Sequence, residues 1–415
     1  MDARNGASVG ANKIHISFLG AMNAGKSSLV NAVTSQDMSV VSSAPGTTTD
    51  PVKKSMELLP LGPVLLIDTP GYDDSGELGT LRVQKTRDAI RQSDAAVLVL
   101  DATLGVRECD KKAAALLKEK AIPFVVAWNK ADLGAPDDSG ASEKAAAVFG
   151  PETPAAFVSA KTGLNIEGLK EKIALAAKNS DSKKEFIGGL VKPGDTVILV
   201  IPTDESAPKD RIILPQQMAV RSVIDKGALA ISCNPQTLDD ALRSIKKAPN
   251  LVITDSQAFS SVAKILPKET PLTSFSILMA DYKGTLRAEV DAVQKIKELK
   301  DKDLVLISEG CSHRRQCADI GTVKLPAALK KFTGKDLRFE WTSGQGFPRD
   351  LSPYALAIHC GACMLNAREM QGRLALAKES GLPMTNYGMA LALCSGLLER
   401  SLAVFAAIDQ KGALR

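Results

Sequence analysis

The sequence predicts an α/β protein of three successive domains, because apolar strand candidates alternate with helical segments along most of its 415 residues. A glycine-rich loop between the first strand candidate and the first helix candidate assigns residues 1–179 to the first domain. A polar stretch follows, and a second α/β pattern without such a loop occupies residues 186–268. Two clusters that hold three of the seven cysteines lie in the remainder, residues 269–415, which we predict to form the third domain.

The overall composition limits the classes of partner. Hydrophobic residues make up 45% of the chain and charged residues 24%, which is the balance of an ordinary globular protein. The net charge of +5 is small and no block of like charges occurs, so we expect no nucleic-acid partner. No apolar run reaches the roughly 20 residues that span a bilayer, so we expect no membrane partner. An odd number of cysteines behind an N-terminus without a secretion signal predicts a reducing, cytoplasmic location.

The first domain begins with a β-rich strand candidate at residues 13–19, which leads through the glycine-rich loop into a helix at residues 27–33. Further apolar segments are typical of buried strands: residues 64–67, 95–100, 124–128 and 156–159. Helical patterns lie between or after them at residues 79–92, 111–120 and 164–178. Strands that alternate with helices in this way predict a parallel sheet with helices on both faces.

The second domain shows the same kind of alternation. Its strand candidates are residues 196–201, 228–232 and 251–254, and its helical segments are residues 216–226, 237–247 and 256–266. No phosphate loop and no catalytic group is apparent there, so we expect a structural or oligomerisation module.

In the third domain we expect a strand at residues 275–279, a helix at 286–299 and a buried strand at 303–308. The last of these delivers Glu309-Gly310-Cys311 at its carboxyl end, which is where sites in open α/β sheets lie. A further strand candidate, residues 355–358, precedes the second cysteine cluster. The chain shows no apparent sequence repeat.

Residues 20–27, GAMNAGKS, match the phosphate-loop pattern GxxxxGK[ST] and lie where a strand candidate passes into a helix. Glycines in such a loop allow backbone N–H groups to surround phosphates, and the helix N-terminus favours their negative charge. We expect Lys26 to reach the β- and γ-phosphates and Ser27 to ligate Mg²⁺. The predicted phosphate-binding residues are Asn23, Ala24, Gly25, Lys26, Ser27 and Ser28.

Three further segments complete a guanine-nucleotide site. Asp68-Thr69-Pro70-Gly71 ends a strand, which puts Asp68 beside the Mg²⁺ and the Gly71 amide beside the γ-phosphate. Asn129-Lys130-Ala131-Asp132 ends another strand, and the Asp132 carboxylate can accept two hydrogen bonds from the guanine edge that adenine cannot donate. The last base-contacting loop consists of Ser159, Ala160 and Lys161. Their order and spacing together predict a domain that binds GTP with Mg²⁺.

The segment Pro45-Gly46-Thr47-Thr48-Thr49-Asp50 lies where the first switch of such a domain belongs. It resembles the switch of the Era/TrmE branch of GTPases, which makes Thr48 the threonine that ligates Mg²⁺ when the γ-phosphate is present. Tyr72 follows the DTPG segment, where Ras-type enzymes have a water-orienting glutamine, so we expect slow intrinsic hydrolysis. Asn23 matches the asparagine that helps to hold K⁺ in this branch, which implies K⁺-stimulated turnover. The predicted catalytic residues are Lys26, Thr48 and Gly71.

Two clusters in the third domain contain candidate metal ligands, Cys311-Ser312-His313 and His359-Cys360-Gly361-Ala362-Cys363. They include two of the three histidines of the chain. Thiolates at CxxC spacing bind zinc or iron–sulfur clusters, because two sulfurs three residues apart converge on one metal centre. These residue types alone leave structural zinc and an iron–sulfur cluster both open. Cys317 lies close enough to Cys311 in the sequence to be a spare ligand.

A CxH…HCxxC pattern in which residues 314 to 358, 45 in all, separate the two histidines resembles the cluster motif of the HydF family of FeFe-hydrogenase maturation GTPases. The resemblance covers the whole chain: an Era-like GTPase domain, a middle domain that dimerises in that family, and a C-terminal cluster domain. It implies an α/β fold class with a P-loop GTPase domain followed by two further α/β domains, the last of which binds an iron–sulfur cluster.

The resemblance also implies the cluster type and its ligands. A 4Fe-4S cluster would be held by the thiolates of Cys311, Cys360 and Cys363. The fourth iron would have an exchangeable ligand, for which His359 is the first candidate and His313 the second, with water or Glu309 also open.

In that family the protein is a GTP-hydrolysing scaffold that carries a di-iron precursor bearing CO and cyanide to the apo-hydrogenase. The implied partners are two radical-SAM hydrogenase maturases, the apo FeFe-hydrogenase and a second copy of the chain in a homodimer. The alternative is an RNA- or ribosome-associated GTPase of the Era/TrmE branch with an accessory zinc module. That alternative requires a basic RNA-binding domain, and no KH-type GxxG segment with basic flanks is apparent.

Overall fold

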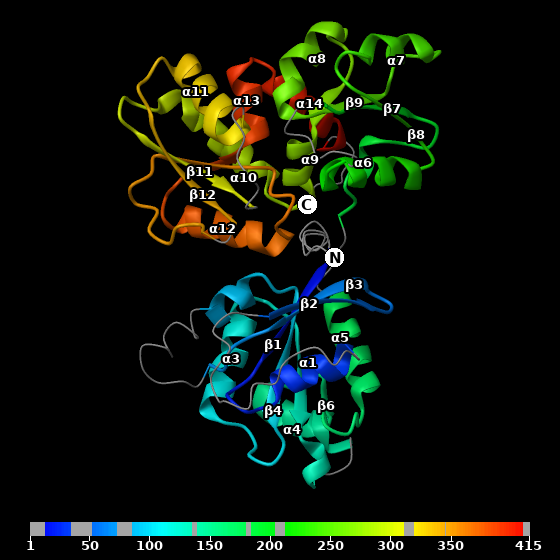
Figure 1. Cartoon of the computed structure of the whole chain (residues 1–415), viewed down its shortest axis with the longest axis vertical. Helices are drawn as coiled ribbons and strands as arrows, with labels where there is room; N and C mark the ends of the chain where they lie inside the picture. The colour runs from blue at the N-terminus through cyan, green and yellow to red at the C-terminus, as the bar shows by residue number, and fades with distance from the viewer. Residues whose placement is uncertain are drawn as a thin grey trace. The chain divides into compact units, whose positions relative to one another are not determined.

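The computed structural model describes residues 13–34, 52–72, 85–134, 139–179, 184–203, 212–310, 319–344 and 346–409. The chain divides into two compact units, residues 1–183 and 184–415 (Figure 1). None of the helices in the described ranges combines the length and the hydrophobicity needed to cross a membrane.

The first unit is built on a six-stranded sheet. Its strands are β1 (Ile14–Leu19), β2 (Val52–Leu58), β3 (Gly62–Asp68), β4 (Ala95–Asp101), β5 (Phe124–Asn129) and β6 (Ala155–Phe157), in the order β2-β3-β1-β4-β5-β6. β2 is antiparallel to β3, and the other pairs are parallel. The predicted strands of this domain are confirmed. β2 is absent from the predicted set because its half-exposed sequence VKKSMEL has no continuous apolar run.

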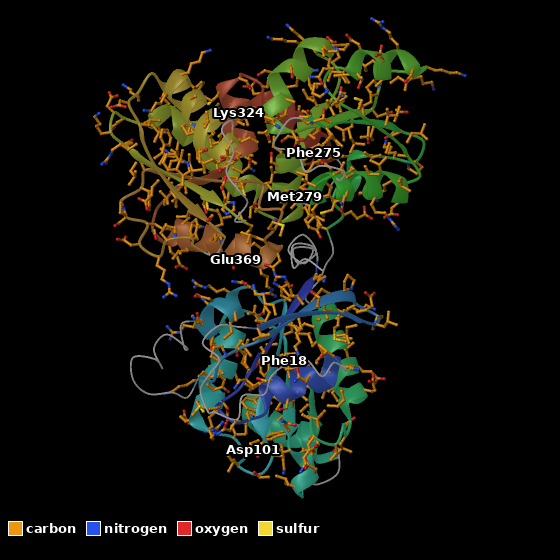
Figure 2. The ribbon with its side chains drawn as sticks, viewed as in Figure 1. Phe18, Asp101, Phe275, Met279, Lys324 and Glu369 are labelled. Carbon is orange, nitrogen blue, oxygen red and sulfur yellow. The ribbon has the colours of Figure 1, made fainter. Side chains whose placement is uncertain are left out.

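Helices cover both faces of this sheet. They are α1 (Lys26–Thr34), residues 85–91, α3 (Glu108–Glu119), the short η3 (Ala131–Leu133), α4 (Ser139–Phe149) and α5 (Ile166–Asn179). Successive residues of β1 point to opposite faces: Phe18 (Figure 2) belongs to the apolar core beneath α1 and α5, and Leu19 belongs to the core beneath α3 and α4. The carboxyl ends of β1, β3 and β5 consequently meet at one edge of the sheet, where the predicted nucleotide loops begin.

The second unit contains two four-stranded parallel sheets. The first consists of β7 (Thr196–Val200), β8 (Leu229–Cys233), β9 (Leu251–Thr254) and β10 (Leu272–Ser274), in the order β10-β9-β7-β8. The second consists of β11 (Leu304–Glu309), β12 (Arg338–Ser343), β13 (Leu356–His359) and β14 (Met384–Asn386), in the order β12-β11-β13-β14. Because β10 pairs with β9, the first sheet extends past residue 268, where we predicted a domain boundary.

One continuous apolar core joins the two sheets of this unit. Its helices are η4 (Gly188–Leu190), α6 (Leu214–Asp225), α7 (Leu238–Ser244), η5 (Ser256–Ala258), α8 (Phe259–Ile265), α9 (Phe275–Tyr282), α10 (Leu286–Val293), η6 (Gln294–Glu298), η7 (Ile320–Lys324), α11 (Leu325–Thr333), α12 (Ala367–Glu379), α13 (Tyr387–Cys394) and α14 (Leu398–Asp409). Figure 1 shows α9 and α13 between the two sheets.

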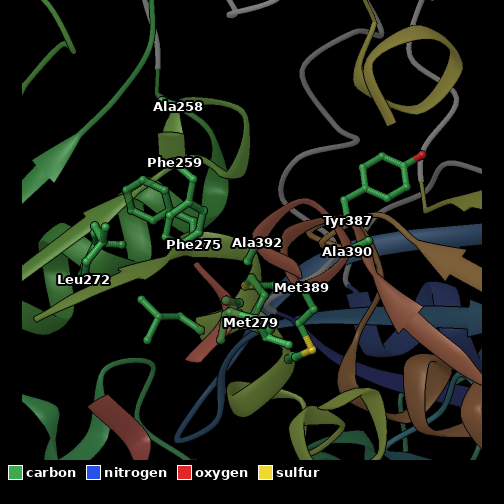
Figure 3. Packing of buried hydrophobic residues seen from close by; sticks show 14 of the residues in the cluster. Ala258, Phe259, Leu272, Phe275, Met279, Tyr387, Met389, Ala390 and Ala392 are labelled. Atoms are coloured by element: carbon green, nitrogen blue, oxygen red, sulfur yellow. The ribbon is translucent and has the colours of Figure 1, made fainter. Parts of the chain in front are cut away.

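Helix α9 contradicts one prediction, because residues 275–279 begin this helix and do not form a strand. Ser274 caps the helix: its hydroxyl accepts a hydrogen bond from the Ile277 N–H at 3.2 Å. The segment FSILM is almost wholly apolar because α9 is buried on several sides, so its helical period is hidden. Phe275 and Met279 lie in the shared core (Figures 2 and 3).

The two sheets of the second unit form a structural repeat, although the sequence shows none. β7, β8, β9 and β10 correspond in order to β11, β12, β13 and β14, and both sheets have the same strand order. In the first sheet Val197 lies opposite Leu251. In the second sheet Val305 lies opposite Leu356, at the corresponding place. The expectation of no repeat is therefore wrong at the level of structure.

Each repeat ends in a helix that packs on the sheet of the other repeat. Gly284 (φ 72°) joins α9 to α10 in the first repeat, and Gly396 (φ 71°) joins α13 to α14 in the second. α10 packs on β14 of the second repeat, and α14 packs on β10 of the first. This packing brings side chains of the first repeat to the strand ends of the second.

Candidate functional site

The phosphate loop lies between β1 and α1. Its backbone turns through two left-handed residues, Asn23 (φ 63°) and Gly25 (φ 87°). A Cβ atom on Gly25 would lie 2.3 Å from Nδ2 of Asn129, and one on Gly20 would lie 2.4 Å from the Val99 carbonyl oxygen. Both positions therefore require glycine, which explains the glycine spacing of the motif.

Ser27 at the start of α1 and Asp68 at the end of β3 form the candidate Mg²⁺ site. The Ser27 hydroxyl donates to Oδ2 of Asp68 at 2.5 Å, while Oδ1 is buried and has no hydrogen-bond partner among the described residues. Burial raises the pKa of the Asp68 carboxyl, and the Ser27 hydrogen bond and the Lys26 charge oppose that rise. A buried carboxylate oxygen without a partner, beside a serine hydroxyl, fits a hydrated Mg²⁺ ion.

Asn129 connects the loops of the candidate nucleotide site. Its Nδ2 donates to the Ala24 carbonyl at 3.0 Å, and its Oδ1 accepts from the Ala160 N–H at 3.1 Å. The Ser159 hydroxyl donates to Oδ1 of Asp132 at 2.6 Å. These bonds join the phosphate loop to the two loops that we expect to contact the base.

The other predicted nucleotide-binding residues surround this framework. Lys26 is buried and donates to the Ala21 carbonyl at 2.8 Å. Lys130 has a left-handed backbone (φ 64°), and its ammonium pairs with Oδ2 of Asp101 at 2.6 Å. The exposed members of the set are Asn23, Ser27, Ser28, Asp132 and Lys161. Thr48 lies outside the described residues.

Tyr72 has a structural contact at the position where Ras-type enzymes have a glutamine. Its hydroxyl donates to Oδ1 of Asp110 in α3 at 2.7 Å. Burial and the Asp110 charge raise the pKa of Tyr72, so the phenol stays neutral. The preceding loop, which contains Gly71, is anchored by the Thr69 hydroxyl, which donates to the Phe18 carbonyl at 2.7 Å. The slow intrinsic hydrolysis expected from this position stays a prediction.

Cys360 and Cys363 lie in the loop between β13 and α12, at the carboxyl end of the second sheet. The Cys360 sulfur accepts hydrogen bonds from the N–H groups of Gly310 at 3.1 Å and Ala362 at 3.4 Å. Burial, with a smaller effect of Cys363, raises the pKa of the Cys360 thiol to about 11. Gly310 immediately precedes the first cysteine cluster in the chain. Three candidate ligands of that cluster lie outside the described residues: Cys311, His313 and Cys317.

This donor set fits a cysteine-ligated metal centre. Thiolates are soft ligands, and N–H groups that point at a sulfur stabilise its negative charge, as in iron–sulfur proteins. The same donors suit structural zinc. Within the described ranges, no three Cys, His, Asp or Glu side chains come together as a complete metal site.

His359 at the end of β13 is buried, and both of its ring nitrogens have partners. Nε2 lies 3.0 Å from Nη1 of Arg373, and Nδ1 lies 2.9 Å from the Cys360 carbonyl oxygen. Since arginine only donates and a carbonyl only accepts, Nε2 is the acceptor and Nδ1 has the proton. Burial and the Arg373 charge lower the His359 pKa to about 3, which keeps the ring neutral. In this arrangement neither nitrogen offers a lone pair to iron, so the geometry does not favour His359 as the fourth ligand.

Glu309, another candidate for the fourth ligand, lies at the same end of the second sheet. Ser308 is opposite His359 in the register of β11 and β13, so Glu309 neighbours Cys360. The Glu309 carboxylate is buried and accepts a hydrogen bond from the Tyr387 hydroxyl at 3.2 Å. Burial and the charges of Cys360 and Glu309 raise the pKa of Tyr387. The site thus includes Tyr387, a residue for which the sequence supplied no ligand pattern.

Two buried charged side chains, which no sequence pattern indicates, lie next to the cysteine loop. Lys283, at the end of α9, donates to the Ala362 carbonyl and, at 2.8 Å, to the Leu365 carbonyl. Glu289 in α10 accepts a hydrogen bond from Asn386. Burial lowers the pKa of Lys283 and raises that of Glu289. No local pattern marks either residue, because a single charge in a helix ordinarily lies on the solvated face.

Three family models match the chain. The Hydrogen maturase F dimerization domain matches residues 186–284, and the Hydrogen maturase F tetramerization domain matches residues 287–404. A third model, described as a 50S ribosome-binding GTPase, matches residues 15–130. The two Hydrogen maturase F models together span more than half of the chain.

Curated relatives are similar over a shorter stretch. A GTPase Der of Kosmotoga olearia is 34% identical over 176 residues, which is 40% of this chain and 40% of the relative. A tRNA modification GTPase MnmE of Desulfotalea psychrophila is 33% identical over 172 residues, 41% of this chain and 36% of the relative. The matches thus span about two fifths of the length of these relatives.

Solved structures of GTPases are also similar. A single-residue variant of Aquifex aeolicus Era bound to GDP·AlF4⁻ has a TM-score of 0.34 and 18% identity, and the match covers 60% of this chain and 97% of that one. NFeoB from S. thermophilus bound to GDP·AlF4⁻ and K⁺ has a TM-score of 0.32 and 23% identity, and the match covers 41% of this chain and 64% of that one.

The order of the matched models agrees with the architecture. A GTPase model lies on the unit with the phosphate loop, and the two Hydrogen maturase F models lie on the unit with the repeated sheets. The chain therefore belongs to the HydF family of hydrogenase maturation GTPases.

Proposed function

We propose that this chain is a GTP-hydrolysing scaffold and carrier, which assembles the di-iron precursor of the FeFe-hydrogenase active site and delivers it to the apo-hydrogenase. The observation that supports the proposal best is the half-buried thiol pair of Cys360 and Cys363, on a chain whose other unit has the candidate residues of a GTP site. A GTPase that acts only as a regulator does not require thiols at the strand ends of a second unit.

For GTP hydrolysis each residue has a separate task. Lys26 places its charge against the β- and γ-phosphates, and Asp132 selects guanine over adenine. The Ser27 hydroxyl and the Asp68 carboxylate would hold Mg²⁺. When bound, Mg²⁺ neutralises charge on the phosphate oxygens. Water then attacks the γ-phosphorus, the bond to the β-phosphate oxygen breaks, and GDP and phosphate leave.

Thr48 and Gly71 are proposed to sense the γ-phosphate. A threonine hydroxyl on Mg²⁺ and a backbone N–H on the γ-phosphate hold their loops only while GTP is bound. GTP therefore acts as a switch on the binding or release of partners and does not power the cluster chemistry.

For the metal centre, Cys311, Cys360 and Cys363 would hold three irons of a 4Fe-4S cluster. When bound, the cluster supplies one iron with an exchangeable position, where a cyanide-bearing precursor can dock. The candidates for the displaced ligand are His359, His313, Glu309 and water, and both ring nitrogens of His359 are engaged in hydrogen bonds in this arrangement.

The proposed partners are two radical-SAM hydrogenase maturases, which supply the precursor, and the apo FeFe-hydrogenase, which receives it. The two matched models are named for dimerization and tetramerization, which supports self-association of this chain. The sequence predicts three domains, at residues 1–179, 186–268 and 269–415. We propose that the boundary between the last two lies further along the chain, because β10 pairs with β9 and the two Hydrogen maturase F models meet between residues 284 and 287. The cytoplasmic location remains a prediction from the cysteine content.

Metal analysis of anaerobically purified protein tests this function against its alternative. We expect iron and acid-labile sulfide in a brown protein, because three thiolates and an exchangeable position suit a 4Fe-4S cluster. Stoichiometric zinc without iron, together with co-purified RNA, would instead support an RNA- or ribosome-associated GTPase with a zinc module. One matched family model is described as a 50S ribosome-binding GTPase, and the relatives include GTPase Der and the tRNA modification GTPase MnmE. These names are the reason to test the RNA alternative in the same experiment.

Replacing K⁺ by Na⁺ at matched ionic strength is expected to slow GTP turnover severalfold. Asn23 is exposed in the phosphate loop with a left-handed backbone, where its side chain can help to hold a monovalent cation beside the phosphates. The matched variant is Asn23→Gly, because glycine keeps the positive φ and removes only the side chain. We expect this variant to lose the preference for K⁺. Equal rates of the wild type in the two salts would refute the potassium site.

A further inference from the structure

Lys283 is a buried ammonium that belongs to the first repeat but contacts the cysteine loop of the second. It is 3% exposed, and its Nζ donates to the Ala362 carbonyl and to the Leu365 carbonyl, one on each side of Cys363. These contacts join residues 79 and 82 positions apart in the sequence. Burial of a lysine costs free energy unless its charge has partners, so a lysine at this place requires an explanation.

The two repeats contact each other at two structurally equivalent points. A Cβ atom on Gly361, in the loop after β13, would lie 3.4 Å from Cβ of Ser276 in α9. A Cβ atom on Gly388 in α13 would lie 2.9 Å from Oγ of Ser256, at the start of η5 after β9. The loop that contains Cys360 therefore packs on α9. In the equivalent contact, the start of η5, which follows β9, packs on α13.

This correspondence provides an internal comparison for the buried charges. Because α9 and α13 begin 112 positions apart, at residues 275 and 387, Lys283 corresponds to Ser395 and Glu289 to Ser401. Ser395 is exposed, and its hydroxyl donates back to its own helix. The two repeats thus have similar backbones here but differ in charge. The buried lysine and glutamate occur only where the helix packs next to the cysteine loop.

The surroundings of Lys283 suit an ammonium beside an anionic centre. The carbonyl oxygens of Ala362 and Leu365 both accept hydrogen bonds from its Nζ, which suits an ammonium that only donates. Lys283, Glu289, Cys360 and Asn386 also line one small cavity next to the loop. A cluster with three thiolate ligands is negatively charged, and a fixed positive charge in a buried place stabilises it strongly.

From this geometry we infer that Lys283 is a positioning residue of the cysteine site: it holds the Cys360–Cys363 loop and places a buried positive charge beside the thiolates. The inference rests on the proposed iron–sulfur centre and deepens it, because it names the group that shapes the loop and compensates its charge. The first repeat thereby contributes to the centre built on the second.

The test compares Lys283→Met and Lys283→Arg with the wild type in full-length protein reconstituted anaerobically with Fe²⁺ and sulfide. Retention of iron against a chelator and the midpoint potential from an EPR-monitored titration are measured. We expect Lys283→Met to hold iron about 10- to 100-fold less tightly, as for other residues that orient metal ligands. We also expect a more negative potential, because the loss of a nearby positive charge disfavours the added electron. Lys283→Arg keeps the charge and should return both values toward those of the wild type.

Lys297→Met is the matched control, because Lys297 is an exposed lysine of the same unit, and we expect it to behave as the wild type. Circular dichroism of each variant establishes that the fold is retained. A folded Lys283→Met protein with wild-type iron retention and potential would overturn the inference, and so would a folded Lys283→Arg protein that binds no cluster. Absence of iron and sulfide from the wild type is a different result, which contradicts the proposed function itself.

Discussion

Replacement of Lys26 by alanine is expected to abolish GTP hydrolysis and to leave the metal content of the protein unchanged. Lys26 is buried at the start of α1, and its ammonium now donates to the Ala21 carbonyl within the same loop. In the nucleotide complex this charge would stabilise the phosphate oxygens in the transition state. Loss of one such group typically lowers kcat by about 100-fold or more, so hydrolysis should fall to near background.

The measurement is phosphate release by the full-length protein, together with iron and sulfide content and activation of apo-hydrogenase. The matched control is Lys112→Ala, since Lys112 is an exposed lysine of α3 in the same unit. Activation of the hydrogenase should fall with hydrolysis, because GTP is proposed to act as a switch on the partners. A Lys26→Ala protein that still hydrolyses GTP at the wild-type rate would show that the phosphate loop is not used as proposed.

Replacement of Cys360 by serine is expected to remove the cluster. The Cys360 sulfur accepts hydrogen bonds from the N–H groups of Gly310 and Ala362, which stabilise a bound, charged sulfur. A serine oxygen is a harder and far less acidic ligand, which iron–sulfur clusters tolerate poorly. The brown colour, the iron and the sulfide should therefore be lost together after anaerobic reconstitution.

The matched control for this change is Cys233→Ser, because Cys233 lies at the end of β8 in the other repeat, away from the cysteine loop. We expect that variant to keep its iron and sulfide. GTP hydrolysis should be unchanged in both variants, since the phosphate loop belongs to the other unit. Undiminished iron and sulfide in Cys360→Ser would contradict the assignment of this thiol as a ligand.

The candidate nucleotide site is predicted from the sequence by short segments, each of which lies at a strand end. The carboxyl ends of parallel strands meet at one edge of a sheet, so the order of strands alone brings Ser27, Asp68 and Asn129 together. The structure adds the contacts between the loops, such as the bonds of Asn129 to Ala24 and Ala160. Only Thr48 lies outside the described residues.

The second unit was harder to predict because its apolar segments lack a clear period. Residues 275–279 are buried on several sides between two sheets, so a helix there has the same continuous hydrophobicity as a strand. The cap at Ser274 is the local sign of the helix, but a single serine is a weak signal. The structural repeat has no sequence signature for a related reason. Two sheets can share strand order and register while different apolar residues fill their cores.

The sequence by itself determined the fold class, and it predicted the candidate guanine-nucleotide residues and the pair of cysteine clusters, because contiguous motifs encode them. Only the tertiary structure decided that both ring nitrogens of His359 are engaged, and that Lys283 contacts the Cys360–Cys363 loop. The Lys283 contacts join residues that become neighbours only because the helices of one repeat pack on the other repeat. No local pattern records such neighbours, because their positions follow from how the two sheets pack against each other.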